Sequence, residues 1–112
     1  MAASSKAVLT LGIVAAGAIA QFNAVTAAGA VASAGGNAVG FANTAGETGQ
    51  RVPVTAMGTA IAIAGAAIAA GAAVEVGSAG KVVTKSAGIA VGRALTAAAA
   101  NGDQIEVLVI PN

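Results

Sequence analysis

GNAVGFANT at residues 36–44 and GIAVGRALT at residues 88–96 are two copies of one pattern, identical at six of nine positions. Each copy then crosses small residues and restarts at a glycine, as GQRVPV from Gly49 and as GDQIEV from Gly102. β-Branched residues that alternate after a glycine are typical of a strand that follows a turn. The pattern therefore predicts a strand–turn–strand unit that occurs twice in the chain.

Length and composition exclude several classes of protein. At 112 residues the chain is predicted to be one domain. Its apolar fraction is 57% with only two phenylalanines, so its core is light, and oligomerisation is a common remedy for such a core. Charged residues make up 8%, far below the usual quarter, which is easier to understand if other protein covers the surface. No cysteine is present, which excludes disulfides and thiolate metal sites.

Further residues complete the predicted secondary structure. Residues 77–80 are rich in glycine and small residues and predict the tip of a β-hairpin. Pro53 lacks an N–H, so its strand is expected at a sheet edge or with the nitrogen turned from the ladder. Thr96 is expected to cap one helical turn over 96–100. The predicted fold is mainly all-β, a small β-barrel or β-sandwich, with strands at 7–14, 21–25, 38–42, 51–56, 60–64, 74–76, 81–84, 89–95 and 104–110.

The first 20 residues have two interpretations. Ala7–Val14 is apolar on both faces, so it is either fully buried or an exposed edge that awaits a partner. The basic residue Lys6, the apolar stretch 7–20 and the small residues before Gln21 also imitate a signal peptide. That stretch is too short to span a bilayer, which takes about 20 residues. The alternative function is thus a small secreted or membrane-active Ala/Gly-rich protein with residues 1–20 as its signal peptide.

The sequence offers no catalytic constellation. His, Cys, Tyr and Trp are absent, which removes the commonest general base and the thiol nucleophile. Residues 77–81 fail as a phosphate-binding loop because the pattern needs glycine at Glu75 and Ser/Thr at Val82. All four carboxylates are expected in solvent. Glu75 and Glu106 would lie on the solvent-facing sides of strands, and Glu47 and Asp103 would lie in turns. We expect no enzyme, cofactor, metal or small-molecule substrate.

The few charges also argue against nucleic acid as a partner. The net charge is +1, and the five basic residues are scattered along the chain. Binding to nucleic acid needs a dense basic face that releases counterions.

Three pieces of the chain carry a resemblance to a known family. They are the AVGxAxT core of both copies with the strand that follows it, IAAGAAVEV at 68–76 leading to GKV at 80–82, and IAVGRALTAAAANG at 89–102 with the final strand. In this order and spacing they resemble the small capsid cement, or head decoration, proteins of tailed bacteriophages. The likeness covers roughly residues 36–110, and more loosely 8–20. Family members often have Gly-Asp before the valine of the middle strand, where this chain has alanines.

The resemblance implies a structural virion protein without enzymatic activity, made in the host cytoplasm and placed on the outer surface of the capsid. Residues 21–112 would be a compact β decoration domain, and residues 1–20 an extended arm that binds the major capsid protein. The protein would be a homotrimer. Candidate capsid contacts are Lys6, Val8, Leu9, Leu11 and Ile13, and candidates for the trimer seam are Arg51, Pro53 and Arg93.

The residues leave one alternative open within this interpretation. Leu9, Leu11 and Ile13 share one face of their predicted strand. They would either bind a partner or fill the core of their own domain.

Overall fold

The computed structural model describes residues 5–110, and in this part of the chain it is β-structure with a single 3₁₀ turn and no α-helix. The predicted all-β fold is therefore confirmed. The helical turn expected over 96–100 does not form, because Ala98 pairs with Ile68 in an isolated β-bridge. The elements are β1 (Lys6–Val14), β2 (Ala24–Val25), β3 (Gly40–Ala42), β4 (Arg51–Ile63), β5 (Ala73–Val76), η1 (Ser78–Gly80), β6 (Val82–Thr84), β7 (Gly92–Ala94) and β8 (Gln104–Val109).

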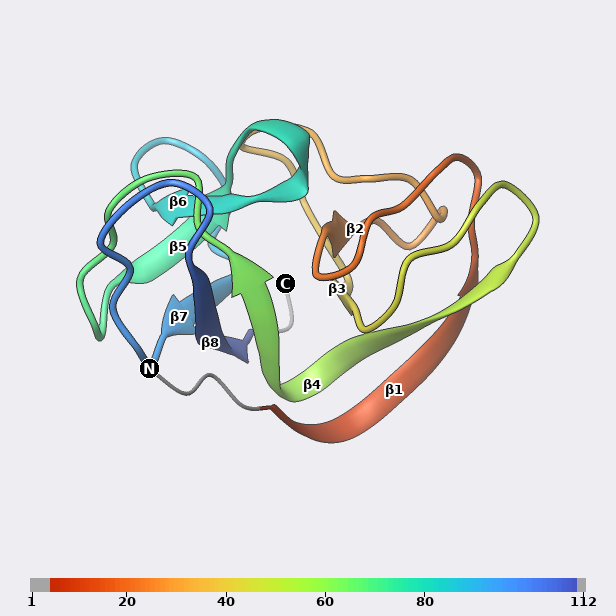
Figure 1. The fold of residues 1–112 in the computed structure, drawn as a ribbon, viewed down its shortest axis with the longest axis horizontal. Coiled ribbons are helices and arrows are strands. Elements are labelled where there is room, and N and C mark those ends of the chain that lie inside the picture. The colour runs from red at the N-terminus through yellow and green to blue at the C-terminus, as the bar shows by residue number, and fades with distance from the viewer. Residues whose placement is uncertain (1–4, 111–112) are drawn as a thin grey trace.

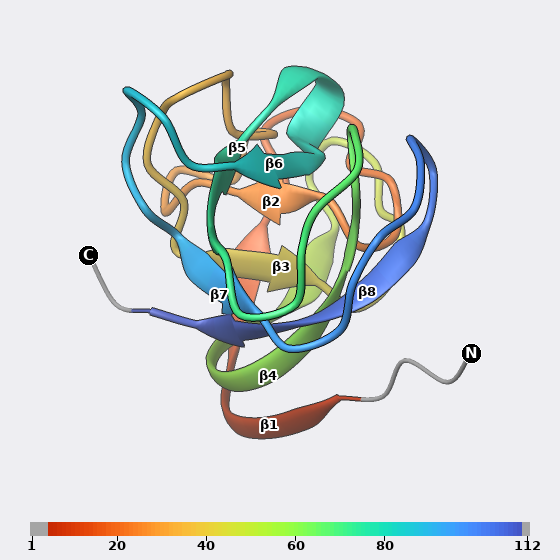
Figure 2. The ribbon, with the colours of Figure 1, turned by 90° about the vertical axis from the view of Figure 1, so that its left-hand side faces the viewer.

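All eight strands belong to one strongly curved sheet. The strand order is β2-β3-β4-β8-β7-β5-β6, and β1 pairs with β4 outside this path. Every strand pair is antiparallel. The sheet curls until the β2 end faces the β5–β6 end, which gives a nearly closed barrel (Figures 1 and 2).

β4 is the long strand that organises the barrel. The sequence predicts two strands, at 51–56 and 60–64, but the chain runs through both as one. Gly58, with φ +95°, lies at the join and lets the strand bend without ending. Thr55 pairs with β1 on one side and with β3 on the other, so this part of β4 is interior. Of the two alternatives predicted for Pro53, a place on an edge strand is therefore wrong.

The duplication extends much further than its sequence signature. We call residues 10–55 the first repeat and residues 59–108 the second repeat. They share four matching strands in the same register, and the second repeat also contains β6. β4 ends the first repeat and begins the second. The first repeat lies on the right of Figure 1 and the second on the left. The matching pairs are Leu11–Val54 with Ala60–Val107, Ala24–Phe41 with Ala73–Arg93, Ala42–Val54 with Ala94–Val107, and the bridges Ile19–Gly46 with Ile68–Ala98.

The glycine at the centre of each sequence copy has a steric reason. A Cβ on Gly40 would collide with the carbonyl oxygen of Thr55 in β4. A Cβ on Gly92 would stand 2.7 Å from the carbonyl oxygen of Leu108 in β8, the matching strand. Only glycine lets the short strand approach its neighbour this closely.

The core is built from small aliphatic residues in two clusters. Phe41 is the largest fully buried side chain, and Val and Ala supply most of the rest. The smaller cluster lies in the first repeat, whereas the larger one joins β5–β8 to residues of β2 and β3. The smaller cluster contains Ala15, Ile19, Val25, Ala42, Val52 and Val54, with Ile13, Val31 and Val39 packed against it.

The repeats differ in the length of one hairpin. In the first repeat Thr26 N donates to Ala30 O, which closes a turn of residues 27–29. In the second repeat the matching pair is Glu75 and Val83, and the longer segment 76–82 connects them. This longer hairpin, predicted from residues 77–80, carries η1 at its tip. Gly80 packs so closely on Val31 and Asn23 that a Cβ would stand 2.7 Å from the Val31 side chain. The second repeat is thereby joined to the first.

Candidate contact surface

β1 is an edge strand whose first half is exposed. It pairs with β4, and no strand among residues 5–110 pairs with its other edge. Val8 is 76% exposed and Leu9 is 42% exposed, while Lys6 and Thr10 also face solvent. An edge strand with free backbone groups is a template for another strand.

The second half of β1 turns partly inward. The register slips around Leu9, where residues of β1 and β4 cease to pair one to one. Beyond this irregularity Leu11 and Ile13 are half-buried, and Ile13 packs on the core of the first repeat. Of the predicted contact residues, Val8 and Leu9 are thus available to a partner, whereas Ile13 serves the fold.

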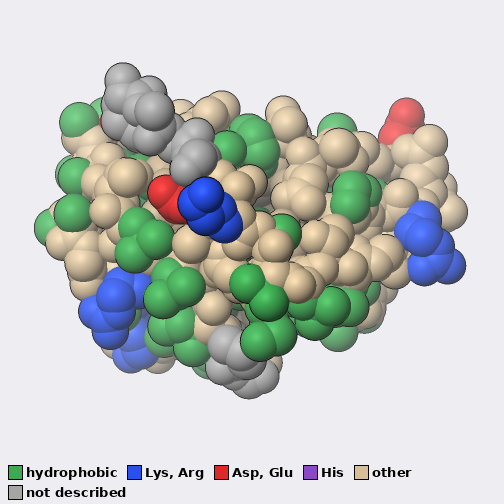
Figure 3. All heavy atoms as spheres, turned by 90° about the horizontal axis from the view of Figure 1, so that it is seen from below, with side chains coloured by type: hydrophobic (Ala, Val, Ile, Leu, Met, Phe, Trp, Pro, Cys, Tyr) green, Lys and Arg blue, Asp and Glu red, His purple; other side chains and the backbone are tan. Residues whose placement is uncertain are grey.

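Exposed apolar side chains continue from β1 onto the adjacent strands. Leu9 pairs with Met57 of β4, which is 43% exposed. Thr59, two residues further along β4, pairs with Leu108 of β8, which is 41% exposed. We call Val8, Leu9, Met57 and Leu108 the apolar band. Figure 3 shows this side of the molecule, where hydrophobic side chains are frequent and charged ones are few.

Charges stand at the two ends of β1. The backbone N–H of Lys6 donates to Thr59 Oγ1 at 2.8 Å, which fixes the start of the strand. Arg51, paired with Val14 at the other end, donates from Nη1 to Gly12 O at 2.8 Å. The strand between these two cations carries no charged residue.

The candidate residues for a trimer seam do not lie together on neighbouring strands. Arg51 and Pro53 lie on β4, and Pro53 is half-buried. Arg93 lies on β7, exposed, and its Nη1 donates to Gly71 O at 2.7 Å. Each guanidinium is thus anchored to a backbone carbonyl of its own chain.

The exposure predicted for Glu75 from the sequence is wrong. Glu75 was expected in solvent, but it is only 9% exposed. Its Oε1 accepts hydrogen bonds from the backbone N–H groups of Ser86 at 2.6 Å and Gly88 at 3.0 Å. These two bonds hold the pKa of the Glu75 carboxyl below its ordinary value. Glu75 therefore fastens the loop between β6 and β7 onto β5.

The other carboxylates form no site with it. Asp103 accepts from the N–H groups of Ala99 and Ala100, which closes the turn before β8. Glu47 is exposed in a turn, as expected, and Glu106 is half-buried on β8. Residues 5–110 contain no group of three metal-ligating side chains. The same residues contain no helix long and apolar enough to cross a membrane.

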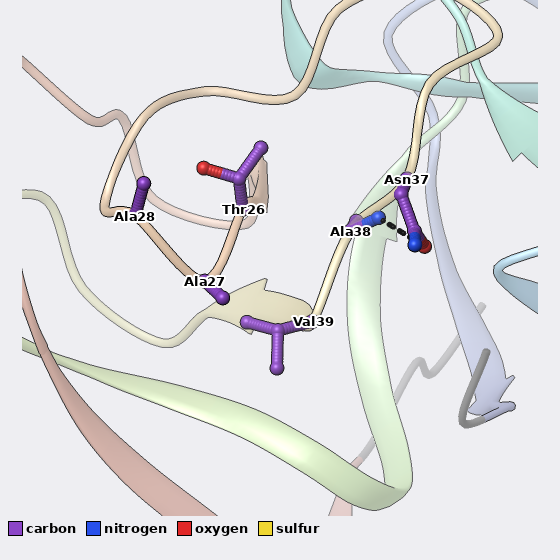
Figure 4. A pocket seen from close by; sticks show the side chains of 6 residues that line it. All are labelled: Thr26, Ala27, Ala28, Asn37, Ala38 and Val39. Atoms are coloured by element: carbon purple, nitrogen blue, oxygen red, sulfur yellow. Dashed lines mark hydrogen bonds between the residues drawn. The ribbon is translucent and has the colours of Figure 1, made fainter.

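The first repeat contains an open hollow that the sequence does not predict. It lies between the turn after β2 and the segment before β3, and one of its sides is formed by Asn37 (Figure 4). Its lining is mostly alanine, which is why no pattern of reactive residues indicates it. The lining residues are Thr26, Ala27, Ala28, Asn37, Ala38 and Val39.

Comparison with known proteins identifies the family. The family model described as phage cement protein matches residues 3–109, nearly the whole chain. No curated protein and no solved structure matches. The match includes β1, both repeats and the final strand. The chain belongs to the family of phage cement proteins.

Proposed function

We propose that this protein binds the outer surface of a phage head and stabilises the shell by linking subunits of the major capsid protein. The family supports a role at the capsid. The observation that carries the finer proposal is the exposed edge of β1 together with the apolar band. This role is structural and requires no catalysis.

The contact combines backbone and side-chain recognition. A strand of the capsid protein adds to the free edge of β1, so that the unpaired N–H and C=O groups on both sides are satisfied. Val8 and Leu9 pack against that neighbour, and burying apolar area contributes roughly 25 cal/mol per Å². Lys6 lies next to them and can pair with an acidic residue of the shell.

Trimer formation is a further part of the proposal. Three copies would bind a shell several times at once, and the effective concentration of the second and third sites then multiplies weak contacts. Arg51, Pro53 and Arg93 stay the candidates for the seam. Sedimentation equilibrium of the purified chain would give three times the monomer mass.

The buried residues after β1 weigh against a cleaved leader. Ala15 and Ile19 are 2% and 3% exposed and belong to the core of the first repeat. Cleavage before Gln21 would remove them together with the whole of β1. A small exported protein formed by cleavage there would lack one of the four strands of its first repeat.

Co-sedimentation with purified heads that lack the chain tests the proposal. Val8→Asp combined with Leu9→Asp places two charges where apolar contact is proposed, so binding should weaken by roughly tenfold or more. Ile89→Asp combined with Leu95→Asp is the matched control, since each of these side chains is 44% exposed outside β1.

Circular dichroism should show that both double variants stay folded. Equal binding by both double variants would argue against β1 as the contact. Failure of the wild-type chain to bind heads would argue against the whole proposal.

A further inference from the structure

The second repeat contains a small peptide-binding site that the chain fills itself. Gly35, in the loop before β3, donates its N–H to Val76 O at 2.8 Å. Its carbonyl accepts from Ile89 N at 3.2 Å. Gly35 thus bridges the β5–β6 hairpin and the segment before β7 with one backbone bond on each side. It also packs on Gly88, where a Cβ would stand 2.7 Å from the Gly35 Cα.

The first repeat has residues at the positions of both walls, although Ala27 begins a turn where Val76 is the last residue of β5. Ala27 corresponds to Val76, and Asn37 corresponds to Ile89. The carbonyl of Ala27 and the backbone N–H of Asn37 make no hydrogen bond within residues 5–110. The correspondence of the walls rests on matching backbone bonds next to them: Val39 N to Val25 O at 2.8 Å, and Val91 N to Val74 O at 2.9 Å.

The hollow already described lies between these walls. It has a volume of about 380 Å³ and opens to solvent. In Figure 4 Ala27 and Ala28 lie on one side, and Asn37, Ala38 and Val39 on the other. No charged residue lines it, so it suits a neutral backbone rather than a charged ligand.

The chain does not fill this hollow as it fills its counterpart. The segment that would do so reciprocally is Ser86-Ala87-Gly88, which repeats Ser33-Ala34-Gly35 if Gly36 is left without a counterpart. The carboxylate of Glu75 holds that segment through the N–H groups of Ser86 and Gly88. In the first repeat the position of Glu75 is taken by Thr26, whose Oγ1 accepts from Ala30 N instead.

We propose that the hollow of the first repeat binds a turn of the capsid protein with glycine at its centre, because Gly35 fills the counterpart with φ +72° in a turn. One backbone N–H of that turn donates to Ala27 O, and one carbonyl accepts from Asn37 N. The template for this contact is Gly35, which makes both bonds to the walls of the second repeat. The identity of the partner rests on the proposed function, whereas the chemistry of the site rests on the repeats.

A filled hollow and a cross-linker test the inference. Ala28 is exposed and lines the hollow, so Ala28→Phe obstructs it without changing the core. Ala67→Phe is the matched control, because Ala67 is an exposed alanine of the second repeat that does not line the hollow. We expect Ala28→Phe to weaken binding to heads roughly tenfold and Ala67→Phe to leave it unchanged.

A photoreactive phenylalanine analogue at Ala30 identifies the occupant, because Ala30 is exposed, follows the turn 27–29 and does not line the hollow. After irradiation on heads, mass spectrometry should find it joined to a glycine-containing peptide of the capsid protein. Binding of Ala28→Phe at wild-type strength, or cross-links only to a second copy of this chain, would overturn the inference and leave the β1 contact standing. Loss of wild-type binding to heads would instead overturn the proposed function, and with it the capsid protein as occupant.

Discussion

At the scale of single residues, Glu75 shows what alternation can and cannot predict. Val74 and Val76 face the core, so the alternating pattern placed Glu75 on the opposite face, which is correct. That face was expected in solvent, but the loop from Lys85 to Gly88 folds over it. Periodicity along one strand reports its two faces, and carries no information about a loop that later covers one of them.

Acid should weaken the fold through Glu75. The folded pKa of Glu75 is lowered, chiefly by the backbone N–H of Ser86 and then by that of Gly88. The carboxylate therefore stabilises the fold above its unfolded pKa, and this contribution is lost as pH falls through the lower folded pKa. Lys85 is the charged group that assists it.

Urea unfolding of wild type and of Glu75→Gln between pH 2.5 and 7 measures this contribution. The variant should be less stable at pH 7, and the difference should shrink as the pH falls below 4. Glu47→Gln, at an exposed turn position, is the control and should follow the wild type. A constant difference between Glu75→Gln and wild type over the whole range would contradict the role given to the carboxylate.

At the scale of elements, most strands could be predicted, and the errors lie where strands join. Segments 51–56 and 60–64 were separated because Met57-Gly58-Thr59 interrupts the alternation. A glycine with positive φ bends an antiparallel strand without ending its pairing, and single-sequence patterns do not distinguish a bend from a turn. The sequence predicts a strand over residues 7–14, but its pairing with β4 depends on residues far away in sequence.

The two halves of β1 should respond differently to truncation. Ile13 packs on the core of the first repeat, so Ile13→Ala should lower the free energy of unfolding by about 1–2 kcal/mol. Val8 is 76% exposed, so Val8→Ala should change it by less than about 0.5 kcal/mol. Urea denaturation followed by circular dichroism measures both.

Binding to heads should give the reverse order. Val8→Ala should weaken it more than Ile13→Ala, measured under conditions where both are folded. If Val8→Ala costs as much stability as Ile13→Ala, the first half of β1 serves the fold and not a partner.

At the scale of the whole molecule, the fold is a duplication fused through one strand. The sequence reveals it only at 36–54 and 88–107, where glycine, valine and threonine coincide. The earlier parts of the two repeats also share residues, such as Ile19 with Ile68 and Val25 with Val74. These residues stand among alanines that occur throughout the chain. Such matches carry little information until the register of the strands is known.

Fusion through β4 predicts that the repeats unfold together. Val52 and Ile105 occupy equivalent buried positions in the two repeats. Val52→Ala should cost about 2 kcal/mol and Ile105→Val about 0.5–1.5 kcal/mol. Either change should move the urea midpoint of every amide resonance alike, because β4 belongs to both repeats. Separate midpoints for the two repeats in residue-resolved NMR would show that they are independent units.

The temperature at which heads break open tests the cementing role most directly. Heads that lack the chain should disrupt at a lower temperature than heads to which the purified chain has been added, as followed by release of DNA to a fluorescent dye. The Val8→Asp, Leu9→Asp double variant should not restore the higher temperature, while the Ile89→Asp, Leu95→Asp variant should. An unchanged disruption temperature on heads that have bound the wild-type chain would contradict the account.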